Sequence, residues 1–122
     1  MTEPKAMKAA DISAKLTREL PKWSFSDGAI RRTFRTFGWK GALMVVNTIG
    51  HLAEAAWHHP ELKVSYSAVE IALSSHDAKG ITDRDFALAA QIEAVVGWRP
   101  GLEGPLQGTP TEERYGYIRY DE

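Results

Sequence analysis

The stretch Leu62-Lys-Val-Ser-Tyr-Ser-Ala68-Val-Glu-Ile-Ala-Leu-Ser74 determines the fold that we expect of this chain. After Ala68, the apolar residues Val, Ile and Leu alternate with Glu, Ala and Ser, so that one face of a strand is apolar and the other is polar. Residues 62–66 are close enough in sequence to pair with this strand through a tight turn. The stretch therefore predicts a β-hairpin that is covered on one face.

A second hairpin is expected on the N-terminal side of this stretch. Residues 23–25 form a short strand before the turn Ser26-Asp27-Gly28, and residues 29–39 alternate apolar and polar side chains. Between the two hairpins, residues 41–57 repeat apolar side chains with a helical period and carry almost no charge before Glu54. We therefore expect a long helix that is covered on two sides.

Two further helices flank the hairpins. Residues 9–20 carry apolar side chains four residues apart, and Pro21 ends this pattern. Thr82, with Asp85 three residues later, is a capping signal for a helix that runs to Val96. The order α-β-β-α-β-β-α, with hairpins in place of crossovers, predicts an α+β fold: a four-stranded antiparallel sheet with three α-helices packed on one face.

The composition indicates a single domain and excludes several classes of protein. The chain has 122 residues, 15 of them basic and 16 acidic, and the basic residues are scattered except for Arg31, Arg32 and Arg35, which disfavours nucleic acid as a partner. It has no cysteine, no N-terminal apolar segment of a signal peptide and no apolar run long enough to cross a membrane. We therefore expect a cytoplasmic protein without membrane association.

The composition changes after Trp98. We expect residues 1–98 to form the domain and residues 99–122 to form a Gly- and Pro-rich, Tyr-rich C-terminal extension. Repeated Pro and Gly in residues 99–110 cannot continue a helix or a central strand, so this part should be a surface loop. The aromatic end, residues 115–120, is expected to dock, either on its own domain or on another subunit or partner protein.

Three of the four histidines lie close together in the sequence. His58 and His59 follow the predicted long helix, and His76 follows the last strand of the second hairpin. Because Glu54 precedes His58 by four residues, we expect its carboxylate to orient that imidazole on one helix face. Pro60 should stop the helix at His59 and turn the two imidazoles in different directions. Imidazoles near carboxylates suggest acid-base chemistry or metal binding.

The spacing favours acid-base chemistry over a metal site. No helical His-x-x-x-His pair occurs in the cluster, and the adjacent pair His58 and His59 would bind one ion awkwardly. We therefore predict no metal. His51 lies outside the expected site, and Trp23 either packs in the core or reaches the rim of a pocket.

The pattern Glu54-x3-His58-His59-Pro60-x5-Tyr66-x9-His76-x8-Asp85 resembles the signature of the pterin-4a-carbinolamine dehydratase family. The similarity extends from about Leu20 to Val96, and it includes Lys22-Trp23, Phe34-x-x-Phe37, Pro60-Glu61 and Gly80-Ile-Thr-Asp-Arg-Asp85. The resemblance implies a four-stranded antiparallel sheet with three helices on one side, assembled as a homodimer or homotetramer.

The resemblance also implies a reaction. This is the loss of water from 4a-hydroxytetrahydropterin to give quinonoid dihydropterin, a step of pterin recycling that requires no metal or redox cofactor. By similarity, His58 and His76 are the acid-base pair, and His59 binds or orients the pterin. Glu54 and Asp85 would set the charge and position of the histidines. The remaining expected substrate-binding residues are Trp23, Pro60, Ser74 and Ser75.

The sequence departs from the usual pattern of this family in three places. Leu62 follows Pro-Glu where an aromatic residue is common, and Ser75 stands where a threonine often precedes the strand-end histidine. The larger departure is the extension, whose Gly-Thr-Pro segment and Tyr-rich end resemble RuBisCO assembly factors associated with carboxysomes. The alternative function is thus a catalytically inactive assembly factor of the alpha-carboxysome that binds the RuBisCO large subunit, with its pocket narrowed or blocked by the tail.

Overall fold

The computed structural model describes residues 5–120, so the ends of the predicted domain and extension, residues 1–4 and 121–122, lie outside the described residues. The chain follows the predicted order of helices and strands up to Val96 and then adds a short 3-10 helix and a fifth strand. The elements are α1 (Ala9–Glu19), β1 (Ser24–Ser26), β2 (Ala29–Thr36), α2 (Trp39–Ala56), β3 (Glu61–Ser65), β4 (Ala68–Leu73), α3 (Asp83–Val96), η1 (Glu113–Tyr115) and β5 (Ile118–Arg119).

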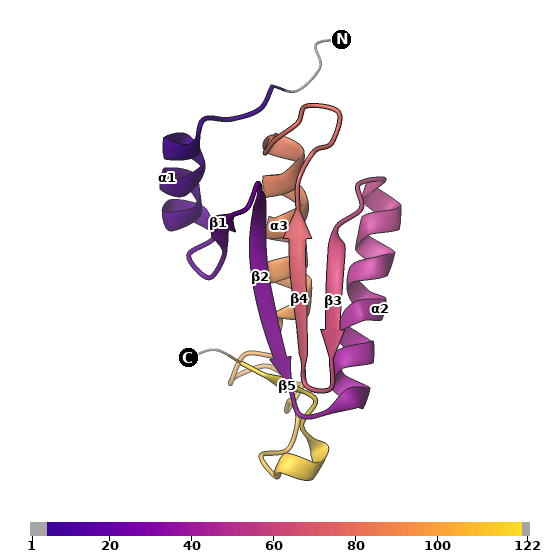
Figure 1. Cartoon of the computed structure of the whole chain (residues 1–122). Coiled ribbons are helices and arrows are strands. Elements are labelled where there is room, and N and C mark those ends of the chain that lie inside the picture. Colours follow the sequence, from indigo (N-terminus) through magenta and orange to yellow (C-terminus); the bar gives the residue numbers. More distant parts are fainter. Residues whose placement is uncertain (1–4, 121–122) are drawn as a thin grey trace.

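The strands form one antiparallel sheet in the order β1-β2-β4-β3. The three α-helices lie on one face of this sheet, with α3 behind its centre and α1 and α2 at its sides (Figure 1). The predicted α+β fold is therefore confirmed. Within the described part of the chain, no helix has the length and apolar character that crossing a membrane would require.

The core lies between the sheet and the helices. The strand positions that alternate inward, such as Phe34 on β2 and Ile71 on β4, are almost fully buried, as the hairpin pattern predicted. They pack against Ile49 of α2 and Ile92 of α3, neither of which is exposed to solvent. The opposite face of the sheet carries polar and small side chains, so the helices cover one face only.

Arg32 is an exception among the basic residues of β2. Arg31 and Arg35 lie on the uncovered face, but Arg32 points inward, where its Nε donates to Glu93 Oε1 of α3 at 2.8 Å. The indole Nε1 of Trp23 donates to the same carboxylate oxygen at 2.8 Å. A buried charge requires such partners, so this cluster fixes α3 to the sheet. The sequence grouped Arg31, Arg32 and Arg35 as one set of basic residues, but Arg32 does not share the uncovered face of the other two.

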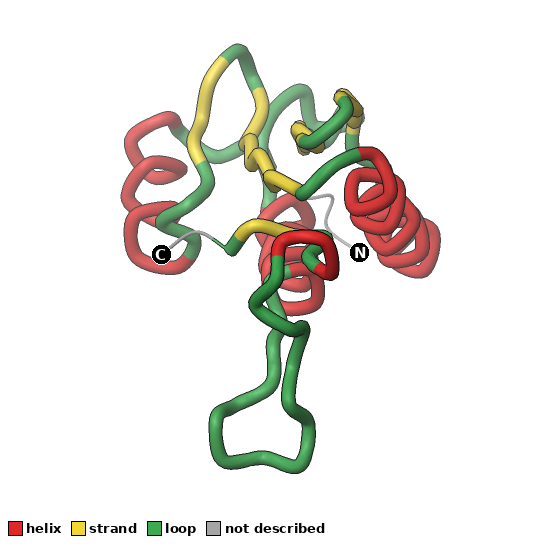
Figure 2. The backbone as a smooth tube through the Cα atoms, turned by 90° about the horizontal axis from the view of Figure 1, so that it is seen from below, coloured by secondary structure: helices red, strands yellow, loops and turns green. Residues whose placement is uncertain are grey.

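The C-terminal extension returns to the domain and completes the sheet. β5 pairs antiparallel with the end of β2, where Thr36 is opposite Ile118, and Ile118 is buried. The guanidinium of Arg119 stacks on the Phe37 ring at 3.9 Å from its centroid. Between α3 and η1, the chain forms a long loop that extends away from the helices (Figure 2). The sequence predicted the loop and docking of the tail, but not a fifth strand.

Close contact between the extension and α2 depends on Gly41. A Cβ atom at this position would overlap the carbonyl oxygen of Tyr117 and would lie 2.9 Å from the Thr36 Cβ. We expect Gly41→Ala to lower the free energy of unfolding by about 1–3 kcal/mol, because the backbone of the extension must move away. Urea denaturation followed by circular dichroism measures this change.

The matched control is Gly50→Ala on the same helix. A Cβ atom at position 50 meets nothing within 4 Å, so this substitution should raise stability by about 0.5–1 kcal/mol through helix propensity alone. Equal stability of the two variants would contradict the packing of the extension against α2.

Candidate active site

The C-terminus of α2 sets the direction of two histidines. Trp57 has a left-handed conformation, with φ of 52° and ψ of 47°. Its N–H donates to the Glu54 carbonyl at 3.2 Å, and the N–H of His58 donates to the Ala53 carbonyl at 3.1 Å. These two bonds define a Schellman motif, which ends the helix and reverses the chain. His58 and His59 therefore lie beyond the helix.

This turn changes the predicted pairing of Glu54. The spacing of four residues predicted a contact between Glu54 and His58, but that contact requires both residues to be helical. Because the chain leaves the helix at Trp57, the Glu54 Oε1 instead lies 2.7 Å from Nε2 of His59. The predicted Glu54–His58 pair is therefore wrong, although His58 and His59 each have a carboxylate partner.

The partner of His58 is Asp85 at the start of α3. Nε2 of His58 lies 2.6 Å from Asp85 Oδ1, and Asp85 is completely buried, whereas 14% of the His58 side chain is exposed. The second carboxylate oxygen, Oδ2, accepts from the backbone N–H of Thr82 at 2.9 Å and closes the predicted capping box of α3. Asp85 thus joins the beginning of α3 to the segment that follows α2.

The hydroxyl groups around Asp85 form one ordered chain of hydrogen bonds. Ser75 Oγ donates to Asp85 Oδ2 at 2.8 Å, so its single proton is used there. Thr82 Oγ1 must then donate across the 2.8 Å contact to Ser75 Oγ, and Thr82 Oγ1 itself accepts from the backbone N–H of Arg84 at 3.2 Å. The hydroxyl protons of Thr82 and Ser75 therefore both point along the chain toward the carboxylate. In this arrangement Asp85 Oδ1 can accept a hydrogen bond from the Nε2–H of His58.

His76 lies on the loop that follows β4. The backbone groups of Ser75 and Gly80 pair with each other, which closes this loop, and His76 is exposed on it. Next to His76, the Asp77 carboxylate accepts from Arg84 at 2.5 Å, and this hydrogen bond lowers the pKa of Asp77 from its ordinary value. The loop is therefore anchored at both ends, to β4 and to α3.

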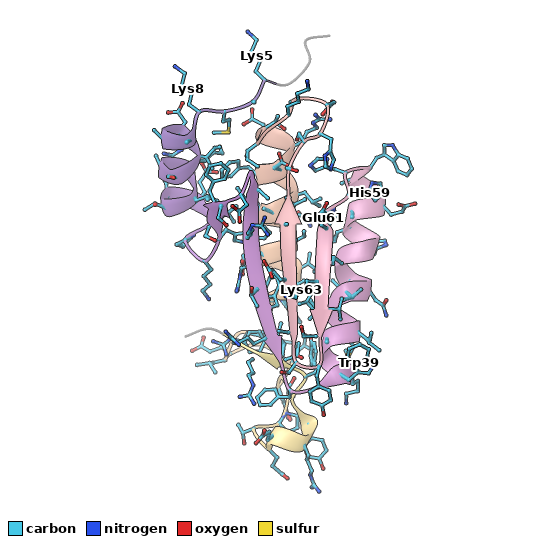
Figure 3. All side chains as sticks on the ribbon, viewed as in Figure 1. Lys5, Lys8, Trp39, His59, Glu61 and Lys63 are labelled. Atoms are coloured by element: carbon cyan, nitrogen blue, oxygen red, sulfur yellow. The ribbon has the colours of Figure 1, made fainter. Side chains whose placement is uncertain are left out.

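A pocket of about 150 Å³ lies at the end of the sheet where β2 begins and β4 ends. Figure 3 shows His59 at the end of α2 and Glu61 at the start of β3, both at this end of the molecule. Such a volume is small beside the roughly 300–1,000 Å³ of pockets that enclose drug-sized ligands, so it suits one edge of a small flat molecule. Its lining residues are Asp27, Gly28, Ala29, Arg31, His59, Glu61, Ala72, Ser74 and His76.

Three of the predicted site residues line this pocket: His59, Ser74 and His76. His58, Ser75 and Asp85 form the hydrogen-bonded group described above, and Glu54 pairs with His59. Pro60 connects His59 to β3 and is partly buried. The structure does not bring Trp23 to the pocket: its ring is 4% exposed and its N–H is bonded to Glu93.

Other lining residues were not predicted from the sequence. Arg31 is the most notable of these, since its Nη1 lies 3.4 Å from Glu70 on the uncovered face of the sheet. A signal for it existed: the alternation of both hairpins puts Arg31 and Ser74 on the face opposite the core. Antiparallel pairing of Ile30 with Leu73 then brings these two residues together.

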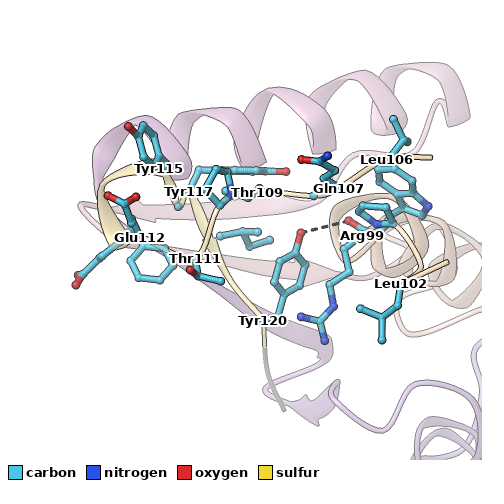
Figure 4. Close-up of a pocket in the computed structure, with 18 of the residues that line it drawn as sticks. Arg99, Leu102, Leu106, Gln107, Thr109, Thr111, Glu112, Tyr115, Tyr117 and Tyr120 are labelled. Carbon is cyan, nitrogen blue, oxygen red and sulfur yellow. Dashed lines mark hydrogen bonds between the residues drawn. The ribbon is translucent and has the colours of Figure 1, made fainter. Parts of the chain in front are cut away.

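A larger hollow of about 1,140 Å³ lies at the other end of β2. It is lined by the extension, with Phe37 and Trp98 from the domain, and no histidine lines it (Figure 4). Tyr120 donates its hydroxyl to the Trp98 carbonyl at 3.3 Å, and its ring lies against the Arg99 guanidinium. Burial raises the pKa of Tyr120 above its ordinary value. Because two histidines line the smaller pocket and none lines this hollow, we place the candidate active site in the smaller pocket.

Among residues 5–120, no three His, Cys, Asp or Glu side chains are grouped as the ligands of a metal ion would be.

Comparison with known proteins identifies relatives over most of the chain. The model of the family described as pterin 4 alpha carbinolamine dehydratase matches residues 5–95. A relative from Chloroflexus aurantiacus that is named after this family is 43% identical over 88 residues, which cover 72% of this chain and 94% of the relative. One from Aquifex aeolicus, named in the same way, is 47% identical over 77 residues, covering 63% of this chain and 78% of the relative.

Two solved structures resemble the fold. A transcriptional coactivator/pterin dehydratase from Brucella melitensis has a TM-score of 0.70 and 27% identity, over 76% of this chain and all of the other. A pterin dehydratase-like protein identified as a RuBisCO assembly factor in the alpha-carboxysome has a TM-score of 0.52 and 17% identity, over 63% of this chain and 89% of the other. The second likeness concerns the fold alone.

The ordered hydrogen bonds predict the effect of changing Ser75. We expect Ser75→Ala to lower the free energy of unfolding by about 1–3 kcal/mol, because the buried Thr82 hydroxyl loses its acceptor and Asp85 loses a donor. Ser75→Thr keeps the hydroxyl and should cost less than about 1 kcal/mol. Urea denaturation of both variants measures the difference, and equal losses would indicate that the hydroxyl is not part of the chain.

Proposed function

The chain belongs to the pterin-4a-carbinolamine dehydratase family, and on this premise we propose that it removes water from 4a-hydroxytetrahydropterin to give quinonoid dihydropterin. One observation carries the proposal: two of the histidines in the family-like pattern, His59 and His76, line the same pocket. Within the described part of the extension, residues 99–120, no residue lines this pocket, which favours a pocket that is not blocked by the tail. A blocked pocket is what the alternative function led us to expect.

The reaction needs two proton transfers. One proton leaves a ring nitrogen of the pterin, and another reaches the 4a-hydroxyl as it departs as water. Imidazole groups can perform both transfers near neutral pH, and each well-placed group contributes about 10²–10⁴ in rate. The reaction exchanges protons only, so the proposal requires neither a metal nor a redox cofactor.

We assign His58 and His76 to the acid-base pair and His59 to orienting the pterin. Asp85 supports the role of His58: by accepting the Nε2 proton, it leaves Nδ1 as the nitrogen available for proton exchange. His58 does not line the pocket itself but precedes His59, which does, so the proposal requires Nδ1 to reach the substrate from beside the pocket. Glu54 supports the role of His59 in the same way, through its contact with Nε2 of that imidazole. Ser74 lies in the same pocket, where its backbone can bind the edge of the pterin.

We also propose that two copies of the chain associate through β3. This strand pairs with β4 on one edge only among the described residues, and unpaired edges are prone to pair with another chain. Apolar side chains are exposed beside it: Val64 on β3, Tyr66 in the turn, and Leu43 and Met44 on α2. An apolar rim of this kind suits a second copy of the same edge in a homodimer or homotetramer.

The mass in solution tests this association. Light scattering after size exclusion should give a multiple of the 13.6 kDa chain, and the double variant Leu43→Asp, Val64→Asp should shift it to the monomer, because charges would be buried at the contact. Leu102→Asp, on the distant loop, is the control and should not change the mass. A wild type of 13.6 kDa would contradict the proposal.

The dehydration rate tests the enzyme assignment. Purified protein is mixed with freshly generated 4a-hydroxytetrahydropterin, and quinonoid dihydropterin is followed by stopped-flow absorbance. We expect the wild type to exceed the spontaneous reaction, and His58→Ala and His76→Ala to lose about 10²–10⁴ in rate, since each removes a proton carrier. His51→Ala is the matched control, because His51 is exposed on α2 and does not line the pocket.

A specific observation favours a second candidate function, assembly of RuBisCO. The loop of the extension projects away from the helices (Figure 2), and two apolar residues on it, Leu102 and Leu106, are exposed. If the wild type does not exceed the spontaneous rate, the dehydratase proposal fails. Binding of the purified RuBisCO large subunit by the full chain, abolished in the double variant Leu102→Ser, Leu106→Ser, would then support the alternative.

A further inference from the structure

Trp57 combines two unfavourable features at the turn between α2 and the histidines. Its backbone has a φ of 52°, a left-handed conformation in which glycine is the usual residue at this position of a helix end. Its side chain is 76% exposed, so burial of the large apolar ring does not offset the strain. A strained residue of this kind persists where a neighbouring interaction or a function requires it.

The neighbouring interaction is with His59. The two rings meet edge to face, with centroids 5.0 Å apart and an interplanar angle of 83°. On the same imidazole, Glu54 holds Nε2 at 2.7 Å. His59 is half exposed and follows the end of a helix, so without such contacts its ring would rotate freely. Trp57 and Glu54 together therefore hold the His59 imidazole in one orientation, one through a ring contact and the other through a hydrogen bond.

The left-handed turn itself makes the ring contact possible. In a continued helix, residues two positions apart project from different faces and do not meet. Reversal of the chain at Trp57 brings its indole beside the ring two residues later. The contact and the strain therefore have a common origin, and His59 is the histidine that lines the pocket next to this turn.

We propose that Trp57 is a positioning residue that orients His59 toward the pterin, at the expense of helix-end stability. The orienting role rests on the proposed dehydratase function, but the ring contact and its strain do not. Aromatic edge-to-face pairs are weak individually, so we expect a moderate effect on substrate binding rather than loss of the reaction. Trp57 does not touch the substrate pocket and is not a catalytic residue.

Trp57→Gly removes both the strain and the ring, and its comparison with Trp57→Ala separates the two features. We expect its melting temperature to rise by about 4 °C, while KM for 4a-hydroxytetrahydropterin rises roughly five- to tenfold and kcat changes less than twofold. Trp57→Ala removes the ring and keeps the strain, so it should show the same rise in KM without the gain in stability. Trp57→Phe keeps a ring at the same place and should restore KM to within about twofold of wild type.

A measurement on the free protein makes the test independent of the reaction. The imidazole proton resonances of His59 should be displaced by the indole ring current in wild type, and should move to unperturbed positions in Trp57→Gly and Trp57→Ala. If the wild type lacks dehydratase activity but shows this displacement, the proposed function fails and the ring contact stands. Undisplaced resonances in wild type, or an unchanged KM in an active Trp57→Gly variant, would overturn the inference.

Discussion

The buried carboxylate of Asp85 is the point at which the parts of this molecule are joined. It caps α3 through Thr82, accepts from Ser75 after β4, and holds His58 after α2. A charge without solvent access is tolerated only when its partners are complete, so the ends of these three elements must come together for the chain to fold. Folding thereby fixes the position of His58.

Most of the fold could be predicted because its signals are local. Alternation in the two hairpins and the capping pair of Thr82 with Asp85 depend on neighbours in the sequence, and each gave an element in its observed place. β5 could not be predicted in the same way, since two residues, Ile118 and Arg119, carry no periodicity. The position of β5 depends on close contact between the extension and α2, two segments that are distant in sequence. This contact is possible because Gly41 has no side chain.

The candidate site was predicted in its residues more than in its pairings. His59 and His76 do line one pocket, but Glu54 contacts His59 in place of the predicted His58, whose partner is Asp85. The reason is the conformation of one residue, Trp57, which a sequence pattern does not favour because left-handed helix ends usually carry glycine or asparagine. Trp23 was ambiguous for a different reason: its buried partner Glu93 is distant in the sequence.

The structural features that support the two candidate functions lie at opposite ends of β2. The pocket lies where the strand begins at Ala29, and the extension pairs where it ends at Thr36, about 23 Å away at roughly 3.3 Å per residue. A partner bound to the projecting loop would therefore not need to cover the histidines. Because β5 and the pocket share a rigid strand without sharing a residue, the presence of the extension is no argument against catalysis, and docking and proton transfer are compatible on one chain.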